Sequence, residues 1–138
     1  MQAWKVALNK AGGVAIVELD IPDDAQKVEF QSPTTQARYG RCSFADVVSI
    51  KTRNRKHELV DIDEAYSAFN FNFIYKPGLR VYPDLFDDCP RFECLAGIHY
   101  FLDYGAAIAY SNVPWFLIRK KDFNRMPCTL DSIFLPNL

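Results

Sequence analysis

One stretch decides the fold expected for this chain: Glu93-Cys94-Leu95-Ala96-Gly97-Ile98-His99-Tyr100-Phe101-Leu102-Asp103. Gly97 is expected to adopt a backbone conformation that other residues disfavour. The apolar run 98–102 predicts a buried strand, and Asp103 predicts the N-cap of a short helix over 104–110. On one side of this helix we expect Tyr104, Ala107 and Ile108. The stretch therefore predicts a strand that passes directly into a helix.

The segments on either side of this stretch predict short strands separated by turns. Alternating apolar and polar residues favour an opening hairpin with strands at 4–8 and 14–21. Further strands are expected at 28–30, at 42–50, in a second hairpin of 69–75 with 79–82 around the turn Lys76-Pro77-Gly78, and at 115–121. The segment 31–40 is expected to be a surface loop that leads into the cluster Arg38-Tyr39-Gly40-Arg41.

The composition indicates one compact domain. The chain has 138 residues, of which 49% are hydrophobic, and this is enough to form one core. We expect the α+β class, as a mostly antiparallel β-sheet with one or two short helices in a single domain over 1–138. Residues 123–138 are expected to form an extended C-terminal arm that packs on this subunit or on a neighbour, which makes a homo-oligomer one hypothesis.

Charge and hydropathy narrow the classes of partner. Sixteen basic and seventeen acidic residues give a net charge of -1, so no global positive field favours generic nucleic-acid binding. No apolar run approaches the ~18 residues that span a bilayer, and we expect a soluble protein without a membrane partner. Four cysteines are too few for a disulfide scaffold. We therefore expect reduced thiols and a cytoplasmic location.

The central stretch carries the main candidates for chemistry. Cys94 and His99 are weak candidates for a nucleophile and its base, and the alternative is a buried thiol with a core or pocket-wall imidazole. Cys42, Cys89, Cys94 and His99 are residue types that bind zinc, but their spacing matches no standard zinc site. We expect no metal and no cofactor. The basic turn 51–57 is either a solvated loop or an anion contact.

Aromatic and basic residues alternate at several places in the chain. Flat rings stack on nucleobases and guanidinium groups pair with phosphates, so these residues are candidates for a pocket that binds a nucleotide-like ligand. The candidate set is His99, Tyr100, Arg38, Tyr39, Arg41, Tyr75, Arg80, Tyr82 and Arg91. The alternative is that the rings belong to the core and the cations to its rim, as in many sheet proteins.

Four blocks in order along the chain resemble an uncharacterised domain associated with pentapeptide-repeat proteins of bacteria, phages and large viruses. The blocks are 13–27, 41–50, 73–87 and 94–102, and the last resembles the signature Cys-x-x-Gly-Ile-His-Phe-Phe of that domain. The chain departs from the pattern at Phe92, where tryptophan is expected, and at Tyr104-Gly105-Ala106, which replaces a charged helix start. No pentapeptide repeat is present. The resemblance implies a phage setting and no known reaction.

These observations support three hypotheses about function. The first is a non-enzymatic accessory protein of phage type, which binds and sequesters a small phosphorylated or nucleotide-like signal and so weakens a host defence. The second is a protein-interaction module that docks on a host or sibling protein. The third is a hydrolase or transferase that uses His99 and Cys94. The aromatic and basic pattern favours the first over the second, and the absence of a strong enzyme motif disfavours the third.

Overall fold

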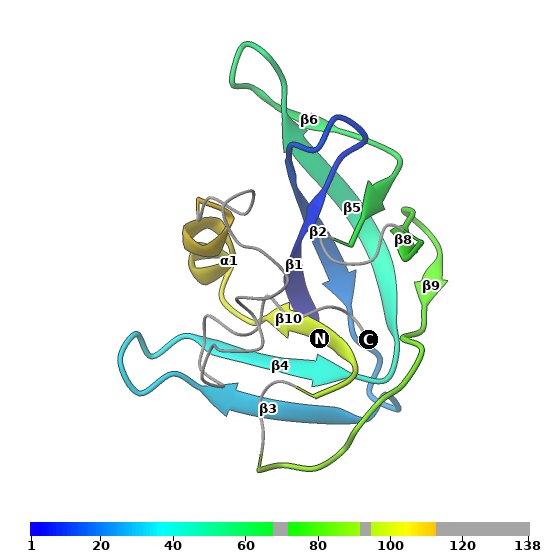
Figure 1. Ribbon diagram of the computed structural model, residues 1–138, viewed down its shortest axis with the longest axis vertical. Helices are drawn as coiled ribbons and strands as arrows, with labels where there is room; N and C mark the ends of the chain where they lie inside the picture. The colour runs from blue at the N-terminus through cyan, green and yellow to red at the C-terminus, as the bar shows by residue number, and fades with distance from the viewer. Residues whose placement is uncertain (68–71, 92–94, 113–138) are drawn as a thin grey trace.

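Two seven-residue strands, β1 (Gln2–Leu8) and β2 (Val14–Asp20), form the centre of the fold in the computed structural model (Figure 1). They pair antiparallel along their whole length, from Gln2 opposite Asp20 to Leu8 opposite Val14. The expected opening hairpin is confirmed. The structure describes residues 1–67, 72–91 and 95–112.

The remaining elements extend this hairpin into one antiparallel sheet with a single short helix. In order, the sheet is β3-β4-β10-β1-β2-β5-β6, with three two-residue strands, β7, β8 and β9, attached off this path. The other elements are β3 (Lys27–Gln31), β4 (Arg38–Cys42), β5 (Ala45–Arg53), β6 (Leu59–Asp61), β7 (Ala65–Tyr66), β8 (Ile74–Tyr75), β9 (Arg80–Val81), β10 (Ile98–Phe101) and α1 (Tyr104–Ser111). The described residues thus form a mostly antiparallel, open sheet with one short helix.

The sheet buries apolar side chains on both faces because successive residues of a strand point to opposite sides. The larger cluster contains alternate residues of β2, namely Ala15, Val17 and Leu19, together with Ile98 and Tyr100 of β10. The smaller cluster contains Val6, Tyr39, Phe101, Ala107 and Tyr110. Helix α1 contributes two residues to the smaller cluster, so it covers that face of the sheet.

The expectation of a surface loop over 31–40 is wrong at its end, where β4 begins at Arg38. β4 lies between β3 and β10 and pairs with both, so four of its five residues are buried. Gly40 permits this close packing, because an added Cβ there would lie 2.5 Å from the carbonyl oxygen of Val28 and 2.9 Å from the hydroxyl of Tyr100. The polar residues of β4 predict a loop, although the segment forms a strand with a partner on each side.

The expected hairpin of 69–75 with 79–82 is also wrong. β8 pairs with β7, whereas β9 pairs with β5, so the turn at Pro77-Gly78 joins two separate pairings. Hydrogen bonds from Gly78 and to Leu79 attach this turn to the backbone of Val47 in β5. Residues 68–71, the strand expected at 115–121 and the arm expected at 123–138 lie wholly or partly outside the described residues.

The expected strand-to-helix transition is confirmed, with two changes in detail. Asp103 occupies the N-cap position, but its side chain makes no hydrogen bond to the helix backbone. The buried side of α1 carries Ala107 and Tyr110, and Tyr104 is exposed. The reason is tertiary, because the ring of Tyr110 packs on that of Phe101, with centroids 5.2 Å apart.

His57 provides a direct test of turn strain. It closes the β5–β6 hairpin with a φ of 62°, in the left-handed region that costs an L-residue about 1–2 kcal/mol. We expect His57→Gly to raise the free energy of unfolding by about 0.5–1 kcal/mol, measured by urea denaturation. Lys56→Gly, at a turn residue without a positive φ, is the matched control and should not stabilise the protein. A loss of stability in His57→Gly would contradict the strain.

Candidate functional site

A buried arginine is the main polar feature of the sheet. Arg41 lies in β4 with 0% of its surface exposed, and its guanidinium reaches the loop that follows β9. Its Nε donates to the carbonyl of Asp87 over 2.8 Å and its Nη2 to the carbonyl of Cys89 over 2.5 Å. The guanidinium also lies over the ring of Phe30, 5.7 Å from its centroid. Arg41 therefore fastens this loop to the sheet.

His99 fastens the other end of the same loop. It stands directly opposite Arg41 in the β10–β4 pairing, so both side chains point to the same face. Its Nε2 lies 2.7 Å from the carbonyl of Leu95, which identifies this nitrogen as the N–H donor. Between them, Gly97 has a φ of 149°, and a Cβ there would lie 3.1 Å from carbons of Arg41 and Phe86. The expected special conformation of Gly97 is confirmed.

A second buried cation lies on the opposite face. Lys5 of β1 is only 8% exposed, and its Nζ donates to the carbonyl of His99 over 2.9 Å. β1 and β10 are joined by one residue pair, Trp4 with Phe101. The ammonium thus binds a carbonyl at the point where these two strands separate.

Burial dominates the titration of these groups. Desolvation lowers the pKa of Lys5 to about 7, although the nearby thiol of Cys42 opposes the shift. Desolvation also raises the pKa of Cys42 to about 12 and lowers that of His99 to about 3. The phenol pKa values of Tyr75 and Tyr100 are raised by burial as well. At neutral pH the thiol of Cys42 is uncharged and so is not an activated nucleophile, and the low pKa of His99 makes its neutral imidazole a weak base.

The nine residues expected to line a ligand pocket do not share one surface. Those that are buried are His99, Tyr100, Tyr39, Arg41 and Tyr75, and those that are exposed are Arg38, Arg80, Tyr82 and Arg91. The buried ones are divided between the two faces, because Tyr100 and Tyr75 belong to the larger apolar cluster and Tyr39 to the smaller one. The structure brings together Arg41 with His99 on one face, and Arg80 with Tyr82 at one sheet edge.

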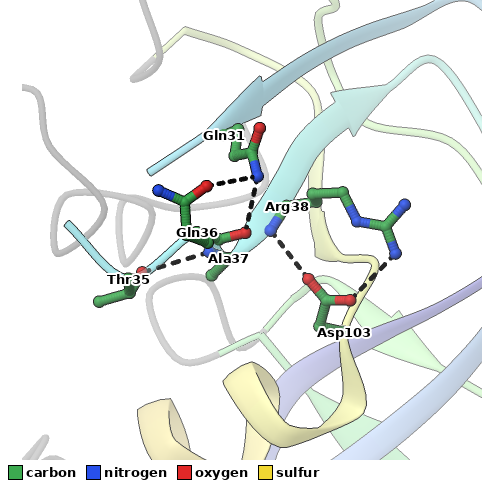
Figure 2. A network of polar contacts seen from close by, with 6 residues as sticks. All are labelled: Gln31, Thr35, Gln36, Ala37, Arg38 and Asp103. Atoms are coloured by element: carbon green, nitrogen blue, oxygen red, sulfur yellow. Dashed lines mark hydrogen bonds and ion pairs between the residues drawn. The ribbon is translucent and has the colours of Figure 1, made fainter. Parts of the chain in front are cut away.

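Arg38 is used in an internal contact between the sheet and the helix. Its Nη2 and its backbone N–H both donate to the carboxylate of Asp103, each over 3.0 Å (Figure 2). The same figure shows the β3–β4 turn closing beside it, where Nε2 of Gln31 donates to the backbone carbonyl and the side-chain oxygen of Gln36. These contacts explain why Asp103 does not cap α1 with its side chain.

Arg80 and Tyr82 lie at the edge of β5, next to Phe44. The guanidinium of Arg80 pairs with both carboxylate oxygens of Asp46, at 2.7 and 3.1 Å, and stacks 4.7 Å above the ring of Phe44. The ring of Tyr82 also packs against Phe44, with the two ring centroids 5.8 Å apart. Tyr82 nevertheless remains 61% exposed.

Cys94 lies outside the described residues, so the geometry of the pair with His99 stays untested. The orientation of Cys42 and His99 determines whether the two side chains can share a zinc ion. Cys42 stands opposite Ile98, one position from His99, so the thiol and the imidazole point to opposite faces of the sheet. A single ion cannot contact both. The described part of the chain contains no group of three or more metal-ligating side chains.

Sequence reasoning missed two features of the site. The alternating pattern of 4–8 does not distinguish Lys5 from a solvent-facing lysine, and the signal in the sequence is that Ala3 and Ala7, two small residues, share its face of the strand. The other feature is the exposure of the segment 79–85, in which Leu79, Tyr82 and Leu85 are 55%, 61% and 70% exposed. Apolar residues in a sequence predict a core, and only the folded structure shows that these three side chains are exposed.

Comparison with known proteins places most of this architecture in one family. A family model described as "Family of unknown function (DUF5758)" matches residues 1–107, which include every strand of the described residues and the start of α1. No curated protein and no solved structure matches the chain. Within the described residues, no helix is long and apolar enough to cross a membrane. The expectation of an uncharacterised domain is thus confirmed, and its association with pentapeptide repeats stays a prediction.

Proposed function

The chain belongs to the DUF5758 family of unknown function, and from this premise we propose that its sheet is a scaffold that presents the segment 79–85 for docking to another protein. The observation that carries the proposal is the exposure of Leu79, Tyr82 and Leu85 on one short segment. Large apolar side chains that solvent reaches on a folded surface are typical of interaction sites.

Backbone hydrogen bonds to β5 hold the start of the segment 79–85 on the sheet. Val47 donates its N–H to the carbonyl of Leu79 over 2.9 Å, and its own carbonyl accepts from Gly78 over 2.8 Å. Two residues of β9 then pair with the start of β5. Anchoring of this kind lowers the entropy lost on binding, which favours a preformed docking surface.

The hydrogen bonds from Arg41 to the loop after β9 support the same proposal. Arg41 holds the carbonyls of Asp87 and Cys89, and these residues directly follow the exposed segment. The segment is therefore fixed at both ends, by β5 before it and by the buried guanidinium after it. Tyr82 is the natural anchor residue, since tyrosine is enriched among residues that dominate binding energy.

The wider setting remains part of the proposal. We propose a phage-type accessory protein that acts in the cytoplasm and docks on a host or sibling protein. The ligand-sequestering hypothesis and the enzymatic hypothesis stay predictions. Of the residues they invoke, Arg38 and Arg80 are already paired with Asp103 and Asp46, and Arg41 with loop carbonyls.

The test compares two double variants as baits. Tyr82→Ser with Leu85→Ser removes the proposed anchors, whereas Ile74→Ser with Tyr104→Ser removes two exposed apolar side chains elsewhere. Proteins that the wild type captures from bacterial lysate are purified and titrated against all three by calorimetry. We expect the first variant to weaken binding by at least about tenfold, because truncation of an anchor residue typically costs 2 kcal/mol or more. The control should bind as the wild type does.

Two outcomes would contradict the proposal. One is equal binding by the anchor variant and the wild type. The other is binding of inorganic phosphate or nucleoside phosphates at micromolar concentration in the absence of any protein partner, which would favour the sequestering hypothesis instead.

A further inference from the structure

Among the described residues, charged side chains are distributed unequally between the two ends of the central strands. The chain is nearly neutral, with a net charge of -1, but exposed cations and exposed carboxylates gather at opposite ends of the sheet. β1 and β2 are joined at the same end of the sheet as β5 and β6, because β2 is antiparallel to both β1 and β5. Figure 1 shows both turns at the top of the view. A hydrogen bond of 3.0 Å from Asn9 Nδ2 to Thr52 Oγ1 joins the two hairpins there.

This end of the sheet, called the basic end below, consists of the turns 9–13 and 54–58 with the strand residues next to them. Its exposed cations are Lys10, Arg53, Arg55 and Lys56. Arg53 donates to the carbonyl of His57 over 2.7 Å, which stiffens the hairpin. Among the nearby carboxylates, Asp61 pairs with Lys51 and Glu64 with Lys76, and the exposed Glu58 and Asp63 offset part of the positive charge. Leu59 adds an apolar side chain that is 45% exposed.

The opposite end, where β2 finishes and β5 begins, is acidic and is called the acidic end. Its exposed carboxylates that form no ion pair among the described residues lie in the turn after β2 and in the loop after β9: Asp23, Asp24, Asp84, Asp87 and Asp88, of which Asp87 accepts a hydrogen bond from the N–H of Cys89. Two further carboxylates, Asp20 and Asp46, are paired with the N-terminal amine and Arg80. Arg91, Lys27 and the buried Arg41 offset part of this charge. The docking segment 79–85 lies at this end.

We propose that the partner of the docking segment is a second copy of this chain, whose basic end docks on the acidic end of the first. The inference rests on the proposed docking function and names its partner. Carboxylates at the acidic end match the guanidinium and ammonium groups of the β5–β6 hairpin. The exposed ring of Tyr82 offers a stacking surface to an arginine, and Leu85 offers an apolar contact to Leu59.

The geometry of such a contact decides the kind of assembly. The two surfaces lie on different ends of one chain, so the contact is heterologous, and each copy keeps one free surface of each sign. Copies therefore add head to tail, and the assembly grows with concentration rather than stopping at a symmetric dimer. Because the attraction is between exposed charges, salt screens it.

The experiment measures the mass of the full chain by sedimentation velocity across a concentration series. We expect the average mass to rise with concentration at about 20 mM salt and to return to that of the monomer at about 500 mM, where the screening length is only a few ångströms. A monomer at low salt over the whole concentration series would overturn the inference.

Charge reversal at each end makes the test specific. Arg55→Glu with Lys56→Glu makes both ends acidic, and Asp84→Lys with Asp88→Lys makes both ends basic, so each variant alone should be monomeric. An equimolar mixture should associate again, since each end then finds an opposite end on the other variant. Glu58→Lys with Asp63→Lys is the control: it changes the net charge as the second variant does, but at the basic end, and should keep association. Failure of the mixture to associate would overturn the inference.

The outcomes also separate this inference from the proposed function. If the wild type is monomeric but another protein binds it through Tyr82 and Leu85, docking stands and the second copy is excluded. If the wild type associates and Tyr82→Ser with Leu85→Ser associates equally well, the docking segment is not part of the contact between copies and the inference is overturned, whereas the titration of captured proteins still decides the proposed function.

Discussion

Replacing Arg41 with methionine is expected to lower the free energy of unfolding by about 3–5 kcal/mol. The guanidinium donates to the carbonyls of Asp87 and Cys89 and lies over the ring of Phe30. Methionine fills much of the same space but donates no hydrogen bond. A hydrogen bond from a charged group contributes about 1.5–3 kcal/mol; two such bonds are lost, and so is the packing of the guanidinium on the ring.

Urea denaturation measures this loss, and hydrogen exchange locates it. Exchange should accelerate most at the amide of Asp87, which donates to the carbonyl of Ala96 in the loop that Arg41 holds. Arg41→Lys should be intermediate, since a single ammonium cannot reproduce the planar fork that reaches both carbonyls. Arg38→Met is the control, because that guanidinium is exposed and solvent screens its ion pair with Asp103. A loss below 1 kcal/mol in Arg41→Met would show that the loop is held by other contacts.

Replacing Lys5 with methionine is expected to remove most of the dependence of stability on pH between about 7 and 9. Burial lowers the pKa of Lys5 to about 7 in the folded protein, from an ordinary value of 10.5. Between these values the unfolded chain binds more protons than the folded one, so stability rises with pH. For one such group the slope approaches about 1.4 kcal/mol per pH unit.

The upper limit of this window follows from other buried groups. Cys42, Tyr75 and Tyr100 have raised pKa values, so above pH 9 the folded protein holds protons that the unfolded chain releases. Stability then stops rising, and the wild type should be most stable near pH 9. Lys10→Met is the control, because Lys10 is exposed and should leave the slope as it is. An unchanged slope in Lys5→Met would mean that the Lys5 amine is hydrated and titrates normally.

Much of the fold could be predicted from short-range patterns. The opening hairpin follows from the alternation in residues 2–20, which brings one set of side chains to each face. The strand at 98–101 and the helix that begins at Tyr104 follow from an apolar run that ends at Asp103. Gly97 was predicted to need an unusual backbone, and its φ of 149° confirms this. Each of these features depends on residues that are close in sequence.

The predicted site was less accurate because it depended on long-range pairing. The sequence over 31–40 predicts a loop, since the polar residues of β4 give no sign that β3 and β10 enclose it. The second hairpin was wrong because β9 finds its partner in β5, thirty or more residues earlier in the chain. Residues that were grouped by chemistry, such as Arg41 and Arg80, consequently lie in different environments.

The sequence by itself determined the strands of the opening hairpin, the strand and helix of the central stretch, and the special backbone at Gly97, because local periodicity and backbone sterics are enough for these. Only the tertiary structure decided what the polar residues of that stretch do. His99 faces Arg41 and binds a loop carbonyl, whereas its own carbonyl accepts a hydrogen bond from Lys5. Strand register sets these contacts, and register depends on which distant segments pair.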